Sequence, residues 1–401
     1  MRGVRASMSR LFPSGIERTT ERAQIVDSVV AICDQFDDGY WSNKDQLKEF
    51  PHEFRDAMAS AGWLGMTMPT EHGGSGLGVT EAALMMRMVG HSAGAFAACS
   101  SIHINLFGPH AIIKYGTRDQ QERWIPKLIS GEDQVAFGVT EPDAGLDTTR
   151  IRTRAVRRGA DYVIRGSKVW TSTAQVANKI LLVTRTTPIE ECERPTDGIT
   201  LFYTDLDRAH VCVEAIDKMG RGAVDSNSVI IDDLVVSEND RIGEEGAGFV
   251  MLLDTLNPER ILIAAEAIGI GRRALDKAVD YANERIVFDR PIGKNQSIQH
   301  PLAQSWMALE AAELMVWRAA KLYDEGLPCG AEANAAKFLA ADAAYEACDR
   351  AVRTHGGFGY AREYHVERYL REIMIARLAP VSRELIMCYI AEKVLGLPKS
   401  Y

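Results

Sequence analysis

The chain has no excess of positive charge and no paired cysteines. Its 401 residues include 46 Lys and Arg against 55 Asp and Glu, which gives a net charge of −9. Nucleic-acid binding needs a basic footprint for the phosphates, and no basic stripe is present. The seven cysteines are scattered and form no CxxC pair, which indicates reduced thiols. We therefore expect no nucleic-acid partner and a cytoplasmic location, or the mitochondrial matrix if the source is eukaryotic.

Metal-ligand spacings and long apolar runs are also missing. The nine histidines show no HExxH or comparable spacing, so no metal site is expected. No run of about 18 consecutive apolar residues occurs, so no membrane span is expected. The first ten residues are basic and contain no acid, which faintly resembles an organellar transit peptide. A short basic tail is the favoured interpretation of this segment.

The alternation of strands and helices found in βαβ folds is absent as well. Helical periodicity over about 17–131 gives way to short β-branched runs over about 134–242, and long amphipathic patterns follow from 248 to 397. We predict an α+β fold with an N-terminal helical domain (1–132), a middle antiparallel β-barrel or sandwich domain (133–243) and a C-terminal four-helix-bundle domain (244–401).

Two glycine clusters lie within or directly after helical patterns. Gly269-Ile270-Gly271 has no strand before it, so helix packing is favoured over a dinucleotide-binding turn. Gly356-Gly357-Phe358-Gly359 is typical of a helix-ending loop whose backbone can approach a ligand closely.

Four motifs, in order along nearly the whole chain, resemble those of the acyl-CoA dehydrogenase family. They are Val139–Asp147 (VTEPDAGLD), Gly166–Ser172 (GSKVWTS), Tyr281–Gln296 with its R-x-x-F-x-x-P-I-x-x-x-Q pattern, and His355–Glu372, which begins HGGFGY. The resemblance is specific for the family and not for the substrate. It implies the architecture above, bound FAD, an acyl-CoA substrate, an electron-transfer flavoprotein as partner, and a homotetramer arranged as a dimer of dimers.

The resemblance also implies two sets of flavin contacts. The first set, in which two hydroxyls would bond the polar edge of the ring and an indole would flank it, is Phe137, Val139, Thr140, Trp170 and Ser172. The second set, which would reach the FAD of a neighbouring subunit, is Arg285, Phe288, Gln296, Gly356 and Gly357. An arginine suits a pyrophosphate because its guanidinium offers planar bidentate donors.

These residue types also have ordinary structural explanations. Thr140 and Ser172 could satisfy the ends of strands, and Trp170 could be a core residue. Arg285 could be a cation that interacts favourably with the dipole of a helix C-terminus. The order of the four motifs favours the flavin contacts.

Removing the weakly acidic α-proton of a thioester needs a desolvated carboxylate. Many family members carry this base as the Glu of an I-Y-E-G-T stretch, which corresponds here to Leu378-Ala379-Pro380-Val381-Ser382. Proline cannot be a base. In the isovaleryl and long-chain relatives the Glu lies on an earlier helix, and Glu259 stands at that place. The resemblance thus makes Glu259 the candidate base and Arg260 the neighbouring substrate-binding cation.

The alternative for Glu259 is ordinary helix-start chemistry, with Pro258 as the first helical residue. The sequence also departs from the family pattern, because Leu146 replaces a Ser and Arg353 replaces a Gln. Pro380 lacks the N–H expected to polarise the thioester carbonyl, and Val381 is one candidate to supply it.

The same residues are also compatible with two other functions. One is a flavin-dependent monooxygenase or oxidase of the same fold, and the other is a non-catalytic flavin-binding helical protein. Glu259 favours the dehydrogenase, because oxygen-activating relatives generally need no base for an α-proton.

Overall fold

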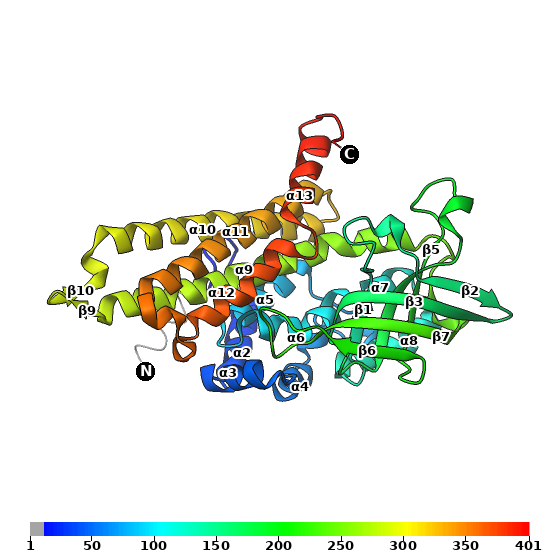
Figure 1. The fold of residues 1–401 in the computed structure, drawn as a ribbon, viewed down its shortest axis with the longest axis horizontal. Helices are drawn as coiled ribbons and strands as arrows, with labels where there is room; N and C mark the ends of the chain where they lie inside the picture. Colours follow the sequence, from blue (N-terminus) through cyan, green and yellow to red (C-terminus); the bar gives the residue numbers. More distant parts are fainter. Residues whose placement is uncertain (1–11, 401) are drawn as a thin grey trace.

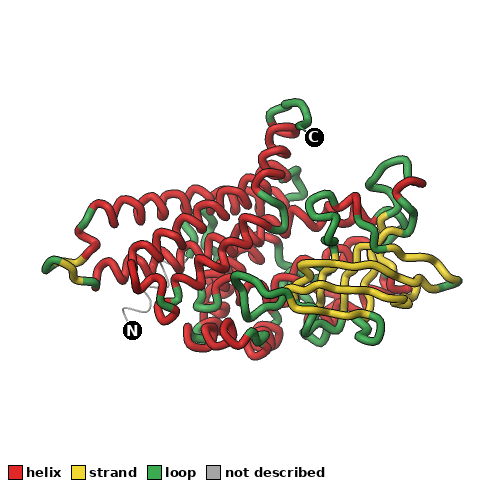
Figure 2. The backbone as a smooth tube through the Cα atoms, viewed as in Figure 1, coloured by secondary structure: helices red, strands yellow, loops and turns green. Residues whose placement is uncertain are grey.

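The computed structural model describes residues 12–400. Along the sequence, a helical region comes first, a β-sheet follows, and a second helical region comes last (Figures 1 and 2). The basic segment considered above as a tail lies outside the described residues. The first helices are α2 (Thr20–Cys33), α3 (Asp38–Leu47), α4 (His52–Ser60), α5 (Val79–His91), α6 (Ala95–Phe107), α7 (His110–Tyr115) and α8 (Arg118–Ser130). Every residue of α6 is buried, which makes this helix the centre of the N-terminal region.

The middle of the chain forms one eight-stranded sheet with its own apolar core. Its strands are β1 (Val135–Gly138), β2 (Arg154–Arg158), β3 (Asp161–Ser172), β4 (Lys179–Arg185), β5 (Ile199–Asp205), β6 (Val211–Ala215), β7 (Ser226–Ser237) and β8 (Arg241–Ile242). The order is β6-β7-β3-β2-β4-β5-β8, with β1 beside β4. Most neighbours are antiparallel, whereas β4 pairs in parallel with β1 and β2.

The C-terminal region is a helical bundle whose longest member is α9. The bundle contains α9 (Gly248–Glu284), α10 (Gln296–Asp324), α11 (Gly330–His355) and α12 (Val366–Leu378), followed by α13 (Arg383–Tyr389). The short hairpin of β9 (Ile286–Val287) and β10 (Arg290–Pro291) joins α9 to α10. With 37 residues, α9 is about 55 Å long, and it connects the sheet at its start to this hairpin at its end (Figure 1).

Small residues let the helices around α9 approach closely. A Cβ on Gly269 would stand 2.4 Å from the carbonyl oxygen of Arg87 in α5, and one on Gly271 would stand 2.9 Å from the Cα of Ala344 in α11. The prediction that these glycines pack helices is confirmed. The predicted fold class is also confirmed, while the domain boundaries at 132/133 and 243/244 stay predictions.

Pro258 and Glu259 lie inside α9, because the helix begins at Gly248. The helix-start alternative for these residues is therefore wrong. Met251, Leu252 and Thr255 are already buried before the proline. The proline removes one backbone donor, and the continuous buried face holds the helix through this position.

The segment Ala95–Tyr115, which includes α6 and α7, is long and apolar enough to cross a membrane by length and composition alone. However, 89% of its tested window is buried inside the protein. It also contains the buried polar side chains of His103 and Asn105. The segment is therefore buried as expected of a core segment packed between helices.

Candidate active site

Glu259 is a buried carboxylate in the middle of α9, with 9% of its surface exposed. Within residues 12–400 no group donates a hydrogen bond to its carboxylate. Burial raises the pKa of Glu259 to about 7, although the charges of His103, Arg260 and Lys337 oppose this rise and Glu266 adds to it. A base whose pKa lies near neutrality is matched to proton abstraction at physiological pH.

Two cations lie close to this carboxylate. Arg260 donates from Nη1 to Oδ1 of Asn257 at 3.1 Å, and its Nε is buried without a partner among the described residues. Lys337 on α11 is fully buried, and its Nζ donates to the carbonyl oxygen of Val381 at 2.6 Å. Burial lowers the pKa of Lys337 to about 8. Arg260 is predictable from the sequence because it follows Glu259, whereas Lys337 comes from another helix and is not.

The segment that carries the base in many relatives lies beside this cluster. It connects the end of α12 at Leu378 to α13, and Ser382 caps α13 by accepting a hydrogen bond from the N–H of Leu385 at 3.2 Å. Pro380 can offer neither a carboxylate nor an N–H. The N–H of Val381 donates to no acceptor in the described part of the chain, so it is free for a ligand.

The first predicted flavin set lies where the loop after β1 meets β3. Lys168 of β3 donates to the carbonyl oxygen of Val139 at 3.0 Å and pairs with Glu141 at 2.8 Å. The N–H of Val169 donates to the carbonyl oxygen of Thr140 at 2.9 Å. Burial alone would raise the pKa of Glu141, but the ammonium of Lys168 and the hydrogen bonds from Thr153 and Arg152 together lower this pKa. These contacts fix Thr140 beside the strand that carries Trp170 and Ser172.

Trp170 presents its indole to solvent. The residue is 58% exposed and adopts φ = 61° within an irregularity of the β3–β7 ladder between Lys168 and Thr171. A tryptophan in the left-handed region of backbone conformation is strained, and such strain is typical of functional sites. The alternative of a core residue is therefore wrong. The hydroxyls of Thr140 and Ser172 form no hydrogen bond with any described residue, so they do not satisfy strand ends.

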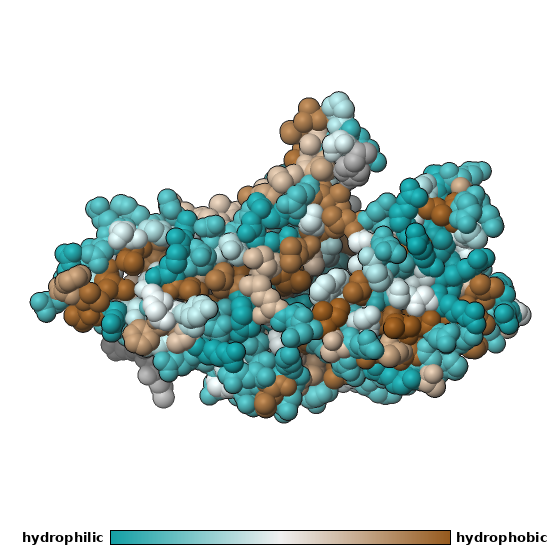
Figure 3. Space-filling view, viewed as in Figure 1, coloured by the Kyte–Doolittle hydropathy of each residue, from teal (hydrophilic) through white to brown (hydrophobic). Residues whose placement is uncertain are grey.

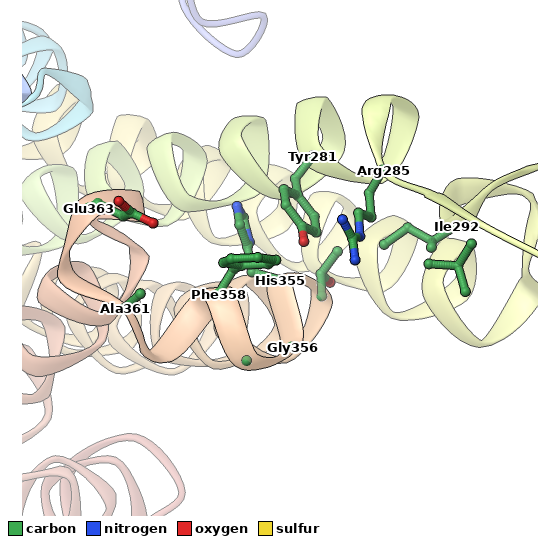
Figure 4. Close-up of a pocket in the computed structure, with 11 residues that line it drawn as sticks. Tyr281, Arg285, Ile292, His355, Gly356, Phe358, Ala361 and Glu363 are labelled. Atoms are coloured by element: carbon green, nitrogen blue, oxygen red, sulfur yellow. The ribbon is translucent and has the colours of Figure 1, made fainter.

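Part of the second set lines a cavity of about 610 Å³ between the end of α9 and the loop after α11. Arg285 and Tyr281 point from α9 toward His355 and Phe358 (Figure 4). Tyr281 stacks on His355 with ring centroids 4.2 Å apart, and the guanidinium of Arg285 lies 5.5 Å from the ring centroid of Phe358. Tyr281, His355 and Phe358 lie within the family-like motifs, but the sequence alone indicates no role for these side chains.

Gly356 and Gly357 form the rim of this cavity. Gly356 ends α11 with φ = 60°, as the predicted helix-ending loop requires, and no atom lies within 4 Å of a Cβ placed on either glycine. The backbone is thus open to a ligand. Phe288, which is 93% exposed, and Gln296 at the start of α10 do not line the cavity.

The two predicted flavin sets lie in separate regions of the folded subunit. The first is on the sheet, and the second is near the β9–β10 hairpin and the end of α11, at the other end of α9 (Figure 1). The available chemistry nevertheless suits a flavin: an exposed indole, two free hydroxyls, and a guanidinium without an ion pair among residues 12–400. Together with a desolvated carboxyl, these groups are those expected of a flavin-dependent oxidoreductase.

Comparison with known proteins identifies the family. The family models for the N-terminal, middle and C-terminal domains of acyl-CoA dehydrogenase match residues 19–132, 136–234 and 246–395. The chain belongs to the acyl-CoA dehydrogenase family, whose cofactor is FAD and whose members act on CH–CH groups. The resemblance inferred from the four motifs is confirmed.

Individual relatives match over nearly their whole lengths. The chain is 36% identical over 397 residues to acyl-CoA dehydrogenase FadE12 of Mycobacterium tuberculosis, covering 95% of this chain and 97% of that protein. It is 34% identical over 328 residues to the caffeyl-CoA reductase-Etf complex subunit CarC of Acetobacterium woodii, covering 82% and 85%. The solved butyryl-CoA dehydrogenase of Megasphaera elsdenii has a TM-score of 0.90 at 27% identity, covering 95% and 99%.

Proposed function

We propose that this protein dehydrogenates an acyl-CoA thioester to the trans-2-enoyl-CoA, with Glu259 as the base that removes the α-proton. The observation that carries the proposal is the buried, unbonded carboxyl of Glu259, whose pKa is raised to about 7 by desolvation. When FAD is bound, it supplies the acceptor for the hydride that leaves the β-carbon.

The residues around Glu259 would each do part of this work. Burial favours the protonated carboxyl, so proton transfer to Glu259 relieves an unfavourable charge. Arg260 would hold the substrate with its unpartnered guanidinium N–H. The free N–H of Val381 would polarise the thioester carbonyl in place of the donor that Pro380 lacks. The bond from Lys337 to the carbonyl oxygen of Val381 would hold this segment in position.

The flavin would be held by residues of two subunits. Thr140, Trp170 and Ser172 on the sheet of one subunit would contact the ring, and the second set would approach from its neighbour. Two features support such an assembly. Phe288 projects into solvent at the hairpin, and an arm at the C-terminus projects from the bundle with apolar side chains on its surface (Figure 3). The exposed apolar and aromatic residues of this arm are Met387, Tyr389, Val394, Leu395 and Leu397.

The same proposal includes a homotetramer, an electron-transfer flavoprotein as electron acceptor, and a cytoplasmic location. A relative named as a subunit of a caffeyl-CoA reductase-Etf complex supports the acceptor. All seven cysteines, which lie within the described residues, are free, as a reducing compartment requires.

The experiment is an anaerobic titration of the purified protein with a panel of acyl-CoA thioesters, followed in the visible spectrum. Bleaching of the flavin bands by a thioester is the expected result. Reduction only by a nicotinamide-driven reductase would identify a monooxygenase or oxidase instead. A colourless protein that takes up no added FAD would contradict the proposal altogether.

A further inference from the structure

A buried imidazole–carboxylate pair lies next to the proposed base. Nδ1 of His103 on α6 is 2.5 Å from Oε1 of Glu266 on α9, and the two residues are 7% and 0% exposed. Each partner keeps one buried atom without a hydrogen bond among the described residues, namely Nε2 of His103 and Oε2 of Glu266. Buried polar atoms are rarely left unpaired, so such atoms point to a missing partner.

The pair lies near the base, and ring contacts connect it to Phe137 of the first flavin set. Glu266 lies two turns after Glu259 on the same face of α9, and the charge of His103 acts on Glu259. On its other side the imidazole contacts Phe107, with centroids 4.5 Å apart, and Phe107 contacts Phe137 of β1 at 5.9 Å. In the proposed reaction the acyl group lies between the base and the flavin, which would bring the acyl group close to His103.

The unpaired nitrogen is a hydrogen-bond donor when the imidazole is protonated, because Nδ1 then bonds Glu266 and Nε2 keeps its own proton. Burial alone would lower the pKa of His103, but the carboxylate of Glu266 outweighs it and raises this pKa, which favours the imidazolium form, in which both ring nitrogens are donors. The two nitrogens point in nearly opposite directions, and Nε2–H therefore faces away from Glu266. A further cation stands nearby, since Arg221 donates to Oγ of Ser100, one turn before His103, at 3.0 Å. These groups suit an oxygen acceptor and not a hydrocarbon.

We propose that His103, oriented by Glu266, donates a hydrogen bond from Nε2 to an oxygen on the acyl part of the substrate. The enzyme then selects acyl-CoA thioesters whose chains carry a hydroxyl, oxo or carboxylate oxygen over chains of carbon alone. This inference rests on the proposed function and names its substrate class. His103 acts on the acyl chain, whereas Glu259 acts on the α-carbon.

The expected selectivity for oxygen-bearing acyl chains corresponds to the free energy of one charge-assisted hydrogen bond in a buried site. We expect kcat/KM of the holoenzyme for an oxygen-bearing acyl-CoA to exceed that for its alkyl isostere roughly 10- to 100-fold. The probes are ω-hydroxyacyl-CoAs of increasing chain length, each paired with the alkyl-CoA in which a methyl replaces the hydroxyl. Mono-CoA esters of dicarboxylic acids form a second arm, which tells an anionic oxygen from a neutral one.

His103→Phe should reduce this ratio to about one, because phenylalanine fills the space without a donor. His103→Gln, which keeps an N–H, should retain part of the ratio. His110→Phe is the matched control, since His110 is a histidine of α7 outside the site, and the ratio should not change. Calorimetric Kd values for the corresponding enoyl-CoA products give the same comparison without any turnover.

The outcomes separate this inference from the proposed function. Equal kcat/KM and equal Kd for oxygenated and alkyl chains, with the flavin bleached by both, would overturn the role of His103 alone. A ratio that survives His103→Phe would also overturn it. Selective binding without bleaching by any thioester would support the inference and contradict the dehydrogenation. Absence of both binding and bleaching would overturn both.

Discussion

Two glutamates on one face of α9 show what decides the role of a buried carboxylate. Glu259 and Glu266 are both buried on this helix, two turns apart. Glu266 is bound by the imidazole of His103, while Glu259 receives no hydrogen bond from any described residue. A buried charge without a bonded partner destabilises the fold. Local rules are broken in this way mainly at functional sites, so the unbonded carboxyl is the one to expect in catalysis.

The largest effect should follow from removing the carboxylate of Glu259. Glu259→Gln preserves the size of the side chain and cannot accept the α-proton. We expect anaerobic flavin reduction by the best acyl-CoA to fall roughly 10²- to 10⁴-fold, with the visible spectrum of the bound flavin retained. Stopped-flow absorbance measures this rate. If the flavin of the Glu259→Gln variant were reduced at the normal rate, the base would be another residue. The contrast between Glu259 and Glu266 would then not explain which carboxylate acts in catalysis.

Removing the carboxylate of Glu266 should chiefly affect stability. Glu266→Gln leaves the imidazole of His103 buried without its anionic partner, and breaking a buried pair from one side destabilises a protein by roughly 3–5 kcal/mol. Glu259→Gln should show no such loss, because no bond is broken. Urea denaturation of the two variants and the parent at one pH makes this comparison. Equal stability of Glu266→Gln and the parent would mean that the pair contributes nothing.

The candidate base Glu259 could be proposed from the sequence because the residue types that identify it can be read along the chain. The loss of a Glu at Pro380 and its presence at Glu259 are visible along the chain, and so are the motifs that contain Thr140, Trp170 and Arg285. The error at Pro258 also has a local cause. Proline favours the first turn of a helix, and a local pattern does not show that packing carries α9 through it.

The partners of these residues could not be predicted, because tertiary packing brings them together. His103 and Glu266 are separated by 163 positions and come from different helices. Lys168 and Glu141 are 27 positions apart, in two separate motifs, and no spacing rule links them. Lys337 bonds a backbone carbonyl, and any residue type at Val381 would offer one.

The rate of reduction should report the ionisation of Glu259. The base works when deprotonated, and its pKa is about 7. We therefore expect kcat/KM to rise about tenfold per pH unit below 7 and to level off above it, which is roughly 100-fold over two units. Anaerobic rates in a series of buffers of constant ionic strength measure this profile. A midpoint near the ordinary glutamate value of 4.5 would contradict the desolvation of Glu259.

The smallest effect concerns stability as a function of pH. The pKa of Glu259 is about 7 in the folded protein against an ordinary value of 4.5, so the folded state binds the proton more tightly than the unfolded state between these values. The free energy of unfolding should therefore fall as the pH rises from 4.5 to 7, with a contribution of about 1–3 kcal/mol from this group.

Glu259→Gln has no proton to release and should lack this decline. The difference in unfolding free energy between variant and parent isolates Glu259, because every other titrating group contributes to both proteins. We expect Glu259→Gln to become the more stable protein as the pH approaches 7 and to stay so above it, in urea denaturation at a series of pH values. A difference that does not change with pH would mean that the carboxyl of Glu259 is solvated in the native state. Glu259 would then titrate like a surface glutamate, which would contradict its role as a desolvated base.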